Sequence, residues 1–324
     1  MKQQGRVLII DQLNLFFRNY IVNPSLSLHG FPIGALRGCI QSLQKLTRET
    51  KPDMIVICWD GEGGSKKRKL LKKDYKAGRK PIRLNRSIRN LTEQEEVENK
   101  VLQQMRLVEY YNELPVVQFM FRSTEADDII AHVAQLPQLE NWQKVIVSSD
   151  KDFFQLLDEN TVLLRPVQKE VLNRHKILER FGIHPTNFAM ARAMAGDKSD
   201  NIEGLGGIGL KTAVKRFPML ANPKAVTFST LTSHCRQQLE EKNIRAYQNV
   251  LEKEDVLRRN YHMMQLYTPI LSIEAKKTIQ ETFSDPDLTF SQTNMLTMMM
   301  QDGFGEVSFS DLYAHCNKIC LDNK

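Results

Sequence analysis

Acidic side chains crowd the opening turn of a predicted helix. Glu125, Asp127 and Asp128 follow Ser123 and Thr124, either of which could cap that helix. Because Glu125 and Asp128 are three residues apart, they should share one helix face. Acids at a helix start are usually caps, since the positive end of the helix dipole favours their charge. Taken alone, these residues therefore indicate a helix start.

A second acidic pair follows a predicted strand. Residues 145–149 are an apolar, β-branched run typical of a buried strand, and Asp150 and Asp152 stand just beyond it. In an extended chain, residues two apart point the same way, so these carboxylates should converge. Five carboxylates near one sheet edge must be protonated, screened or bound to cations. Hard divalent ions with oxygen ligands are the natural partners.

Strands that alternate with helices must position these acids. Apolar runs at 7–10, 54–59, 116–121, 145–149 and 162–165 predict strands, and 34–49 predicts a helix. This alternation predicts an α/β fold with a mainly parallel sheet. Ligands bind beyond the carboxyl ends of such strands, where Asp11, Asp60 and Asp150 all stand. Three strand-terminal acids on separate strands indicate a site.

A long polar insertion separates the second and third predicted strands. Its first part, residues 66–80, is strongly basic with one aromatic residue, Tyr75. On composition alone, a solvated face or a localisation signal explains it as well as a functional surface does. Its second part opens with Thr92 and Glu95, a capping-box pattern. Four apolar residues then recur at helical spacing, which predicts packing rather than binding: Val97, Val101, Met105 and Val108.

A glycine-rich turn follows two further acids, Asp197 and Asp200. Its GxGxxG pattern formally matches a dinucleotide-binding motif, but we expect no strand before it and find no acid at the required distance beyond it. A glycine turn between two short helices would instead present backbone N–H groups to a phosphate. The predicted phosphate contacts are Gly204, Gly206, Gly207, Gly209, Lys211 and Lys215.

Charge and cysteine usage narrow the class of partner. The chain has 324 residues and a formal net charge of +7, with its basic residues in blocks. This pattern favours a polyanion whose phosphates meet the basic surface. The five cysteines form no CxxC pair and favour a reducing cytosol. We find no apolar run long enough for a signal peptide or a membrane span, so we expect a cytoplasmic protein.

The last third of the sequence is less informative. From about residue 222 it is predicted to be helical and of mixed charge. A methionine-rich patch within it is either adaptable core or a partner surface: Met295, Met298, Met299 and Met300.

Taken together, these residues resemble the 5′-nuclease family, which comprises phage and bacterial 5′–3′ exonucleases, flap endonucleases and the 5′-nuclease domain of DNA polymerase I. The matching pieces are IIDQLN (9–14), CWDGE (58–62), YKAGR (75–79), TEADDIIA (124–131), SSDKDFFQL (148–156) and GDKSDNIEGLGGIGLKTA (196–213). They span residues 7–217, and the last three are the most specific. One departure is Gln12, where the family usually has glycine. The chain has the size of a free-standing phage or cellular enzyme.

The resemblance implies a fold and a domain order. It implies a PIN-like nuclease core over 1–185, with a mainly parallel sheet flanked by helices and a helical arch at about 64–114. It implies a helix-hairpin-helix region of the H3TH type over 186–270, where relatives can also hold a monovalent cation such as K⁺. Residues 271–324 would form a C-terminal helical extension whose role the resemblance does not assign.

The resemblance also implies a catalytic set. Asp150, Asp152 and Glu125 would hold a tighter metal ion, and Asp197 and Asp200 mainly a second one. The full acidic set would be Asp11, Asp60, Glu125, Asp127, Asp128, Asp150, Asp152, Asp197 and Asp200. Nine carboxylates without a local histidine group favour Mg²⁺ or Mn²⁺ over zinc. Lys76 and Arg79 would act on the scissile phosphate from the arch, where Tyr75 would also contact DNA.

The implied activity is hydrolysis of phosphodiesters in 5′ flaps, nicked DNA and RNA–DNA primer junctions by a monomer. A sliding clamp or a single-strand-binding protein would be a candidate partner. Two other interpretations stay open. One is a Mg²⁺-dependent phosphohydrolase with an aspartate nucleophile, as Asp150 and Asp152 around Lys151 suggest, although it leaves the hairpin glycines unexplained. The other is a non-catalytic binder of DNA structures, against which the full acidic set argues.

Overall fold

The computed structural model describes residues 5–79, 83–88 and 91–322. Lys80, the last residue of the basic run, and residues 81–82 and 89–90 of the expected arch lie outside this described part. None of the helices in the described ranges combines the length and the apolar character needed to cross a membrane.

A six-stranded sheet with the order β3-β2-β1-β4-β5-β6 forms the centre of the molecule. Its strands are β1 (Arg6–Asp11), β2 (Met54–Trp59), β3 (Val117–Met120), β4 (Gln143–Val147), β5 (Thr161–Arg165) and β6 (Glu170–Leu172). Along this order, every neighbouring pair from β3 to β5 is parallel. The last strand, β6, pairs antiparallel to β5. The predicted α/β fold and its five strands are confirmed. The short strand β6 was not predicted, because three residues are too few to show an alternating pattern.

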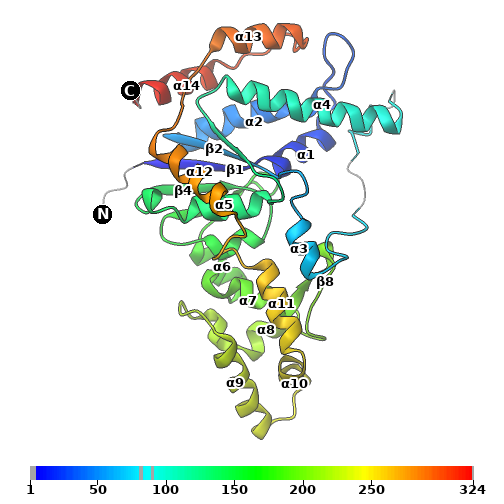
Figure 1. Ribbon diagram of the computed structural model, residues 1–324, viewed down its shortest axis with the longest axis vertical. Coiled ribbons are helices and arrows are strands. Elements are labelled where there is room, and N and C mark those ends of the chain that lie inside the picture. The colour runs from blue at the N-terminus through cyan, green and yellow to red at the C-terminus, as the bar shows by residue number, and fades with distance from the viewer. Residues whose placement is uncertain (1–4, 80–82, 89–90, 323–324) are drawn as a thin grey trace.

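Helices cover both faces of this sheet, as Figure 1 shows. In β1, Leu8 and Ile10 face one core and Val7 and Ile9 face the other, because successive side chains of a strand alternate. The first core includes residues of α1 (Gln12–Val22), α2 (Gly34–Thr50), α4 (Glu93–Asn112), α13 (Gln292–Gln301) and α14 (Ser310–Asp322). The second includes residues of α5 (Ala126–Ala134), α6 (Arg174–Phe181) and α7 (Phe188–Ala195).

The second core continues into a helical region that extends away from the sheet (Figure 1). This region contains α8 (Leu210–Arg216), α9 (Phe228–Glu241), α10 (Arg245–Glu252) and α11 (Glu254–Met264). A two-stranded hairpin of β7 (Gly196–Asp197) and β8 (Ile202–Glu203) leads into it. The chain then returns to the sheet, where α12 (Ile273–Ser284) lies beside α5 and Phe283 stacks on Phe119 of β3 (Figure 1). In the methionine patch, Met295 and Met299 are buried in the first core, whereas Met300 is exposed. Most of the patch is therefore core.

The predicted cap of α5 is wrong. Neither Ser123 nor Thr124 caps α5, because the helix begins after Glu125, and Ser123 has a left-handed backbone with φ of 56°. Their backbones instead bond to the loop after β2, where Ser123 N–H donates to the Glu62 carbonyl and the Thr124 carbonyl accepts from Gly61 N–H. The predicted acid-rich start of α5 is otherwise present.

The apolar stripe predicted on α4 does not pack. Val97, Val101 and Met105 are exposed, and Val108 packs only at the edge of the core. The buried side of α4 carries Gln103, Leu107, Tyr110 and Tyr111. Gln103 accepts the Leu36 N–H at the start of α2, so a polar contact fixes the helix rotation that the apolar spacing alone does not predict. The predicted capping box of Thr92 and Glu95 is confirmed.

Candidate active site

Asp11 sits at the carboxyl end of the central strand β1 and caps α1. Its carboxylate accepts hydrogen bonds from the Asn14 N–H at 3.2 Å and the Ser148 hydroxyl at 2.8 Å. Asn14 in turn accepts the Ser149 N–H at 3.1 Å, which ties the ends of β1 and β4 together. Burial raises the pKa of Asp11 to about 7, and the nearby charges of Asp60 and Asp150 add to this effect.

Gln12 follows Asp11, at the position where glycine was expected. Its side chain is fully buried and accepts a hydrogen bond from the Tyr111 hydroxyl at 3.1 Å. Its amide also donates to the Cys39 sulfur at 3.5 Å. The glutamine therefore fills the interface between α1, α2 and α4 and leaves Asp11 in place.

The acids after β4 adopt a turn instead of the predicted extended pair. Asp150 accepts the Asp152 N–H at 2.8 Å, and Asp152 begins a 3-10 helix, Asp152–Leu156. The two carboxylates are still electrostatically coupled. Burial, followed by the charge of Asp150, raises the pKa of Asp152 to about 7. Burial and Asp150 likewise raise the pKa of Asp127, which therefore faces the end of β4 from α5.

Asp60 follows β2 and turns toward the start of α5. It accepts the Ala126 N–H at 2.9 Å, and burial raises its pKa. Gly61 next to it admits no side chain, because a Cβ there would lie 1.8 Å from the Phe121 carbonyl oxygen. The close approach of these two loops explains the glycine in the Asp-Gly pair.

Glu125 and Asp128 do share one face of α5, as predicted, and that face meets Arg68 of α3 (Lys66–Leu71). The Arg68 Nη1 atom lies 2.6 Å from a Glu125 oxygen and 2.7 Å from an Asp128 oxygen. Arg68 is only 4% exposed, and its Nε donates to the Met263 carbonyl. Asp128 also accepts the Ile270 N–H. The structure therefore uses Asp128 to hold Arg68, instead of presenting it to a metal ion.

The basic insertion docks on the same acids. The Lys76 Nζ lies 2.6 Å from Glu125, and Arg79 forms an ion pair with Asp200. Burial alone would raise the pKa of Glu125, but Arg68 and Lys76 lower it below its usual value. Tyr75 is 4% exposed and its hydroxyl lies 3.3 Å from Glu125, so its ring is not available to contact DNA in this conformation.

Arg192 of α7 links two acids that sequence analysis treated separately. It lies 3.0 Å from Asp152 and also forms an ion pair with Asp197. Burial alone would raise the pKa of Asp197, but Ser199 and Arg192 lower it. Sequence analysis missed Arg192, although a single cation in the apolar helix FAMARAMA was a usable signal.

The glycine turn lies beyond the hairpin β7–β8. A strand does precede it, contrary to expectation, but β8 has two residues and pairs with β7 outside the main sheet. Gly207 has a φ of +75°, which favours glycine. Gly204 has a packing role, since a Cβ there would lie 2.3 Å from the Ala195 carbonyl oxygen. The remaining predicted phosphate contacts are exposed at the start of α8: Gly206, Gly207, Gly209, Lys211 and Lys215.

The acids of this site could supply oxygen ligands to a metal ion. Within the described ranges, no three histidine, cysteine, aspartate or glutamate side chains lie close enough to hold one ion together. Asp11, Asp127 and Asp152 nevertheless carry raised pKa values because they are buried beside other acids. A purely oxygen-donor set with unbalanced negative charge has the chemistry that hard divalent cations require.

Comparison with known proteins identifies relatives of this chain. A family model described as the 5′-3′ exonuclease, N-terminal resolvase-like domain, matches residues 6–182. A 5′-3′ exonuclease of Aquifex aeolicus is 30% identical over 207 residues, which cover 64% of this chain and 66% of that protein. A thermostable DNA polymerase I of Thermus thermophilus is 31% identical over 211 residues, covering 65% of this chain and 23% of the polymerase.

A solved structure supports the same relationship at the level of fold. The flap endonuclease of bacteriophage T5, solved as a complex with DNA and metal ions, covers 93% of this chain and 100% of its own, with a TM-score of 0.64 and 18% identity. At this identity the likeness concerns the fold alone, and it confirms the expected architecture. The chain spans about two thirds of the Aquifex protein and about a quarter of the Thermus polymerase.

Proposed function

The chain belongs to the 5′-3′ exonuclease family, and on this premise we propose that it is a structure-specific 5′ nuclease that hydrolyses phosphodiesters. Its substrates are DNA with a 5′ flap or a nick and RNA–DNA primer junctions. The observation that carries the proposal is the group of mutually repelling acids, buried or half-buried, at the carboxyl ends of β1, β2 and β4. The T5 flap endonuclease, described with DNA and metal ions, has the same fold.

The proposed cofactors are two Mg²⁺ or Mn²⁺ ions. Asp150, Asp152 and Glu125 would mainly hold the first ion, and Asp197 and Asp200 mainly the second. Asp11, Asp60 and Asp127 would complete the acidic set. When bound, such ions activate water and stabilise the charge that builds on a phosphate during hydrolysis. Asp128 is left out of this set, because Arg68 and the Ile270 N–H already occupy it.

The basic side chains of the insertion would orient the substrate. Lys76 and Arg79 now lie on Glu125 and Asp200, within reach of any phosphate that enters the acidic site. A cation there would stabilise charge on the reacting phosphate more in the transition state than in the ground state. Arg192 would keep Asp152 and Asp197 at a fixed separation. Lys76 and Arg79 therefore each hold an acid now and would face the phosphate during reaction.

The exposed start of α8 would bind the duplex away from the cut. Gly206, Gly207 and Gly209 would offer N–H groups to a phosphate, and Lys211 and Lys215 would add charge. A K⁺ ion at this turn, a monomeric state, a cytoplasmic location and binding to a sliding clamp or a single-strand-binding protein are parts of the same proposal. They rest on the family resemblance.

The test is cleavage of a labelled 5′-flap duplex in Mg²⁺ by the full chain and by Asp150→Asn. We expect the wild type to release the flap and Asp150→Asn to retain less than a few per cent of its rate, with binding in metal-free buffer unchanged or tighter. A small phosphate ester serves as the control substrate and should stay nearly intact. If the chain hydrolyses that ester and leaves the flap uncut, the nuclease proposal is wrong and a phosphohydrolase activity takes its place.

A further inference from the structure

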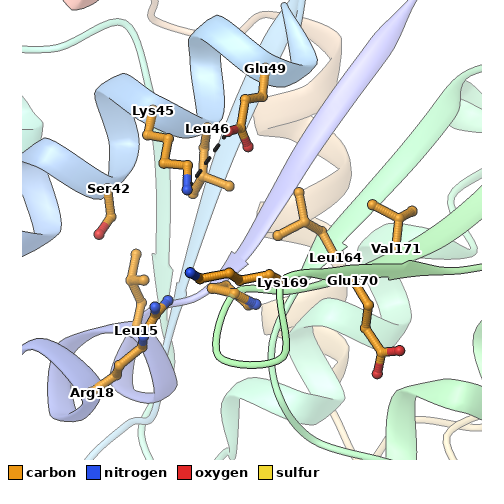
Figure 2. Close-up of a pocket in the computed structure, with 11 residues that line it drawn as sticks. Leu15, Arg18, Ser42, Lys45, Leu46, Glu49, Leu164, Lys169, Glu170 and Val171 are labelled. Atoms are coloured by element: carbon orange, nitrogen blue, oxygen red, sulfur yellow. Dashed lines mark ion pairs between the residues drawn. The ribbon is translucent and has the colours of Figure 1, made fainter.

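A cavity on the α1–α2 face of the sheet is not part of the acidic site. It encloses about 280 Å³ between α1, α2 and the turn that joins β5 to β6. Its apolar lining includes Leu15, Leu46 and Leu164 (Figure 2). Its size is close to the lower end of the range for small-ligand sites, roughly 300–1,000 Å³.

Three cations from three different elements enter this cavity. Arg18 comes from α1, Lys45 from α2 and Lys169 from the turn before β6. Figure 2 shows the charged ends of Arg18 and Lys169 directed toward the middle of the cavity, with Lys45 reaching in from α2. Like charges gathered in this way repel one another unless an anion lies between them.

The acids around the cavity leave a surplus of positive charge. Glu49 lies 3.7 Å from Lys45, and both side chains are largely exposed. The Glu170 carboxylate points away from the cation ends in Figure 2, and Arg165 and Arg180 hold it at 2.8 Å each. Among the described residues, neither Arg18 nor Lys169 forms an ion pair with an acid. Both are therefore free to bind a ligand.

Lys169 is held in place by its backbone. Its φ of 51° lies in the left-handed region, where a residue with a side chain is uncommon. Such positions persist where the surrounding structure determines them, and here β6 is paired to β5 on the far side of the turn. The turn thus fixes where the Lys169 backbone lies at the edge of the cavity, and its exposed side chain reaches inward (Figure 2).

Both walls of the cavity are tied to the acidic site. Arg165 at the end of β5 donates to the Ser149 carbonyl at 3.2 Å. Asn14, one helical turn before Arg18 on α1, accepts the Ser149 N–H. Ser149 is adjacent to Asp150, so the cavity flanks the acids without sharing a residue with them. A strand that reaches the acids could place a neighbouring phosphate here.

We propose that this cavity binds a phosphate group carried by one nucleotide unit. Arg18 and Lys169 contact the phosphate, since a guanidinium pairs with phosphate oxygens through two parallel hydrogen bonds. The leucines contact the sugar and base. The nucleotide is either free or part of a nucleic-acid strand. The strand form rests on the proposed nuclease function, whereas the free form does not.

The free form is tested without metal, in EDTA, by titrating the full chain with thymidine 5′-monophosphate and with inorganic phosphate at low salt. We expect saturable binding to the wild type that is at least tenfold weaker in the double variant Arg18→Gln, Lys169→Gln. Lys277→Gln, which removes an exposed lysine of α12, matches the charge change of the single variant Lys169→Gln and should bind like the wild type. Lys169→Gln alone, at an exposed turn, guards against misfolding of the double variant.

The strand form is tested by flap-DNA binding in EDTA at several salt concentrations. Loss of the contact with this one phosphate should flatten the log–log salt dependence by about 0.7–0.9 in the double variant and leave the control unchanged. Weaker nucleotide binding or a flatter salt dependence of DNA binding in the double variant supports the phosphate site. The first result indicates a free nucleotide as the ligand, and the second indicates a nucleic-acid strand. If neither titration separates the double variant from Lys277→Gln, the proposal is overturned. Flap cleavage is measured separately, so an inactive wild type with phosphate binding would remove the nuclease proposal alone.

Discussion

Two groups of buried acids lie within one site and are neutralised in opposite ways. Glu125 and Asp128 contact Arg68, and Glu125 also contacts Lys76, so the protein balances their charge with its own cations. Asp11 and Asp152 are also shielded from solvent, but the charges of Asp60 and Asp150 lie beside them, and their pKa values rise to about 7. Burial is common to both groups, and the neighbouring charges decide the outcome.

This difference indicates which acids a divalent cation would bind most favourably. A divalent ion at Glu125 must compete with Arg68 and Lys76, whereas an ion near Asp11 and Asp152 meets one cation, Arg192 beside Asp152, and otherwise replaces protons. Arg68 therefore stabilises the fold around the site, and in the proposed mechanism Asp11, Asp127, Asp150 and Asp152 would supply the negative charge that binds the ions.

Arg68→Met should cause the largest loss of stability. Removing one partner of a buried ion pair costs about 3–5 kcal/mol, because it leaves an unbalanced buried charge. Urea unfolding measures the loss, and it should be larger at pH 8 than at pH 5, because burial raises the pKa of Glu125 and Arg68 no longer opposes that effect in the variant. Lys277→Met, at a surface pair, should change stability by less than about 1 kcal/mol. Equal stabilities of the two variants would remove Arg68 from its structural role.

Asp152→Asn and Asp128→Asn should distinguish an acid that is needed for cleavage from an acid that is needed for stability. We expect Asp152→Asn to lower single-turnover flap cleavage by roughly a hundredfold or more, which is about 2.7 kcal/mol. Asp128→Asn should lower stability and keep most of the rate per folded molecule at low temperature. Quenched-flow kinetics on folded fractions provides the comparison. A slow Asp128→Asn enzyme with normal stability would move Asp128 into the metal-binding set.

The stability of Asp152→Asn relative to the wild type should depend on pH in EDTA. The folded-state pKa of Asp152 is about 7, against an ordinary value of 3.8, so between these values the folded state binds more protons than the unfolded state. This group therefore favours folding at low pH, and its contribution falls by at most about 1.4 kcal/mol per pH unit as pH rises through that window.

Asparagine is neutral and loses no stability in this way as the pH rises. The stability of Asp152→Asn relative to the wild type should therefore increase between pH 5 and pH 8. Thermal unfolding at matched pH measures the difference. Added Mg²⁺ at pH 8 should stabilise the wild type and have a smaller effect on the variant. A difference that is constant with pH would mean that Asp152 titrates normally in the folded protein.

Lys211→Ala should give the smallest effect, because Lys211 is exposed and far in sequence from the acids. Loss of one phosphate contact should flatten the log–log salt dependence of DNA binding by about 0.9. Single-turnover cleavage at saturating DNA should barely change. Lys242→Ala, at the exposed end of α9, is the control. A slowed chemical step in Lys211→Ala would contradict a role limited to binding.

Much of this architecture could be predicted from local patterns. Apolar runs located the strands, and Asp11, Asp60 and Asp150 were expected at one sheet edge because parallel strands end together. The capping box at Thr92 fixed the start of α4, since its signal is contained in four residues.

Long-range contacts between polar groups were not predictable. In the run KKRKLL nothing distinguishes buried Arg68 from its exposed neighbours, because the acids that bind it lie more than fifty residues away. Tyr75 was predicted on a DNA-facing surface for the same reason. On α4, the Gln103 contact with Leu36 turned the helix so that its apolar stripe faces outward. Spacing predicts that a face exists, and only tertiary contacts decide which face is buried.

The central claim is that acids neutralised by protons in the absence of metal take up divalent ions instead. Calorimetric titration of the full chain with Mn²⁺, in buffers of different ionisation enthalpy, measures the protons released per ion bound. At pH 7 we expect binding to release protons, because the pKa values of Asp11 and Asp152 are about 7, and at pH 9 the release should fall toward zero. Binding without proton release at pH 7, or equal binding by Asp152→Asn, would contradict the account.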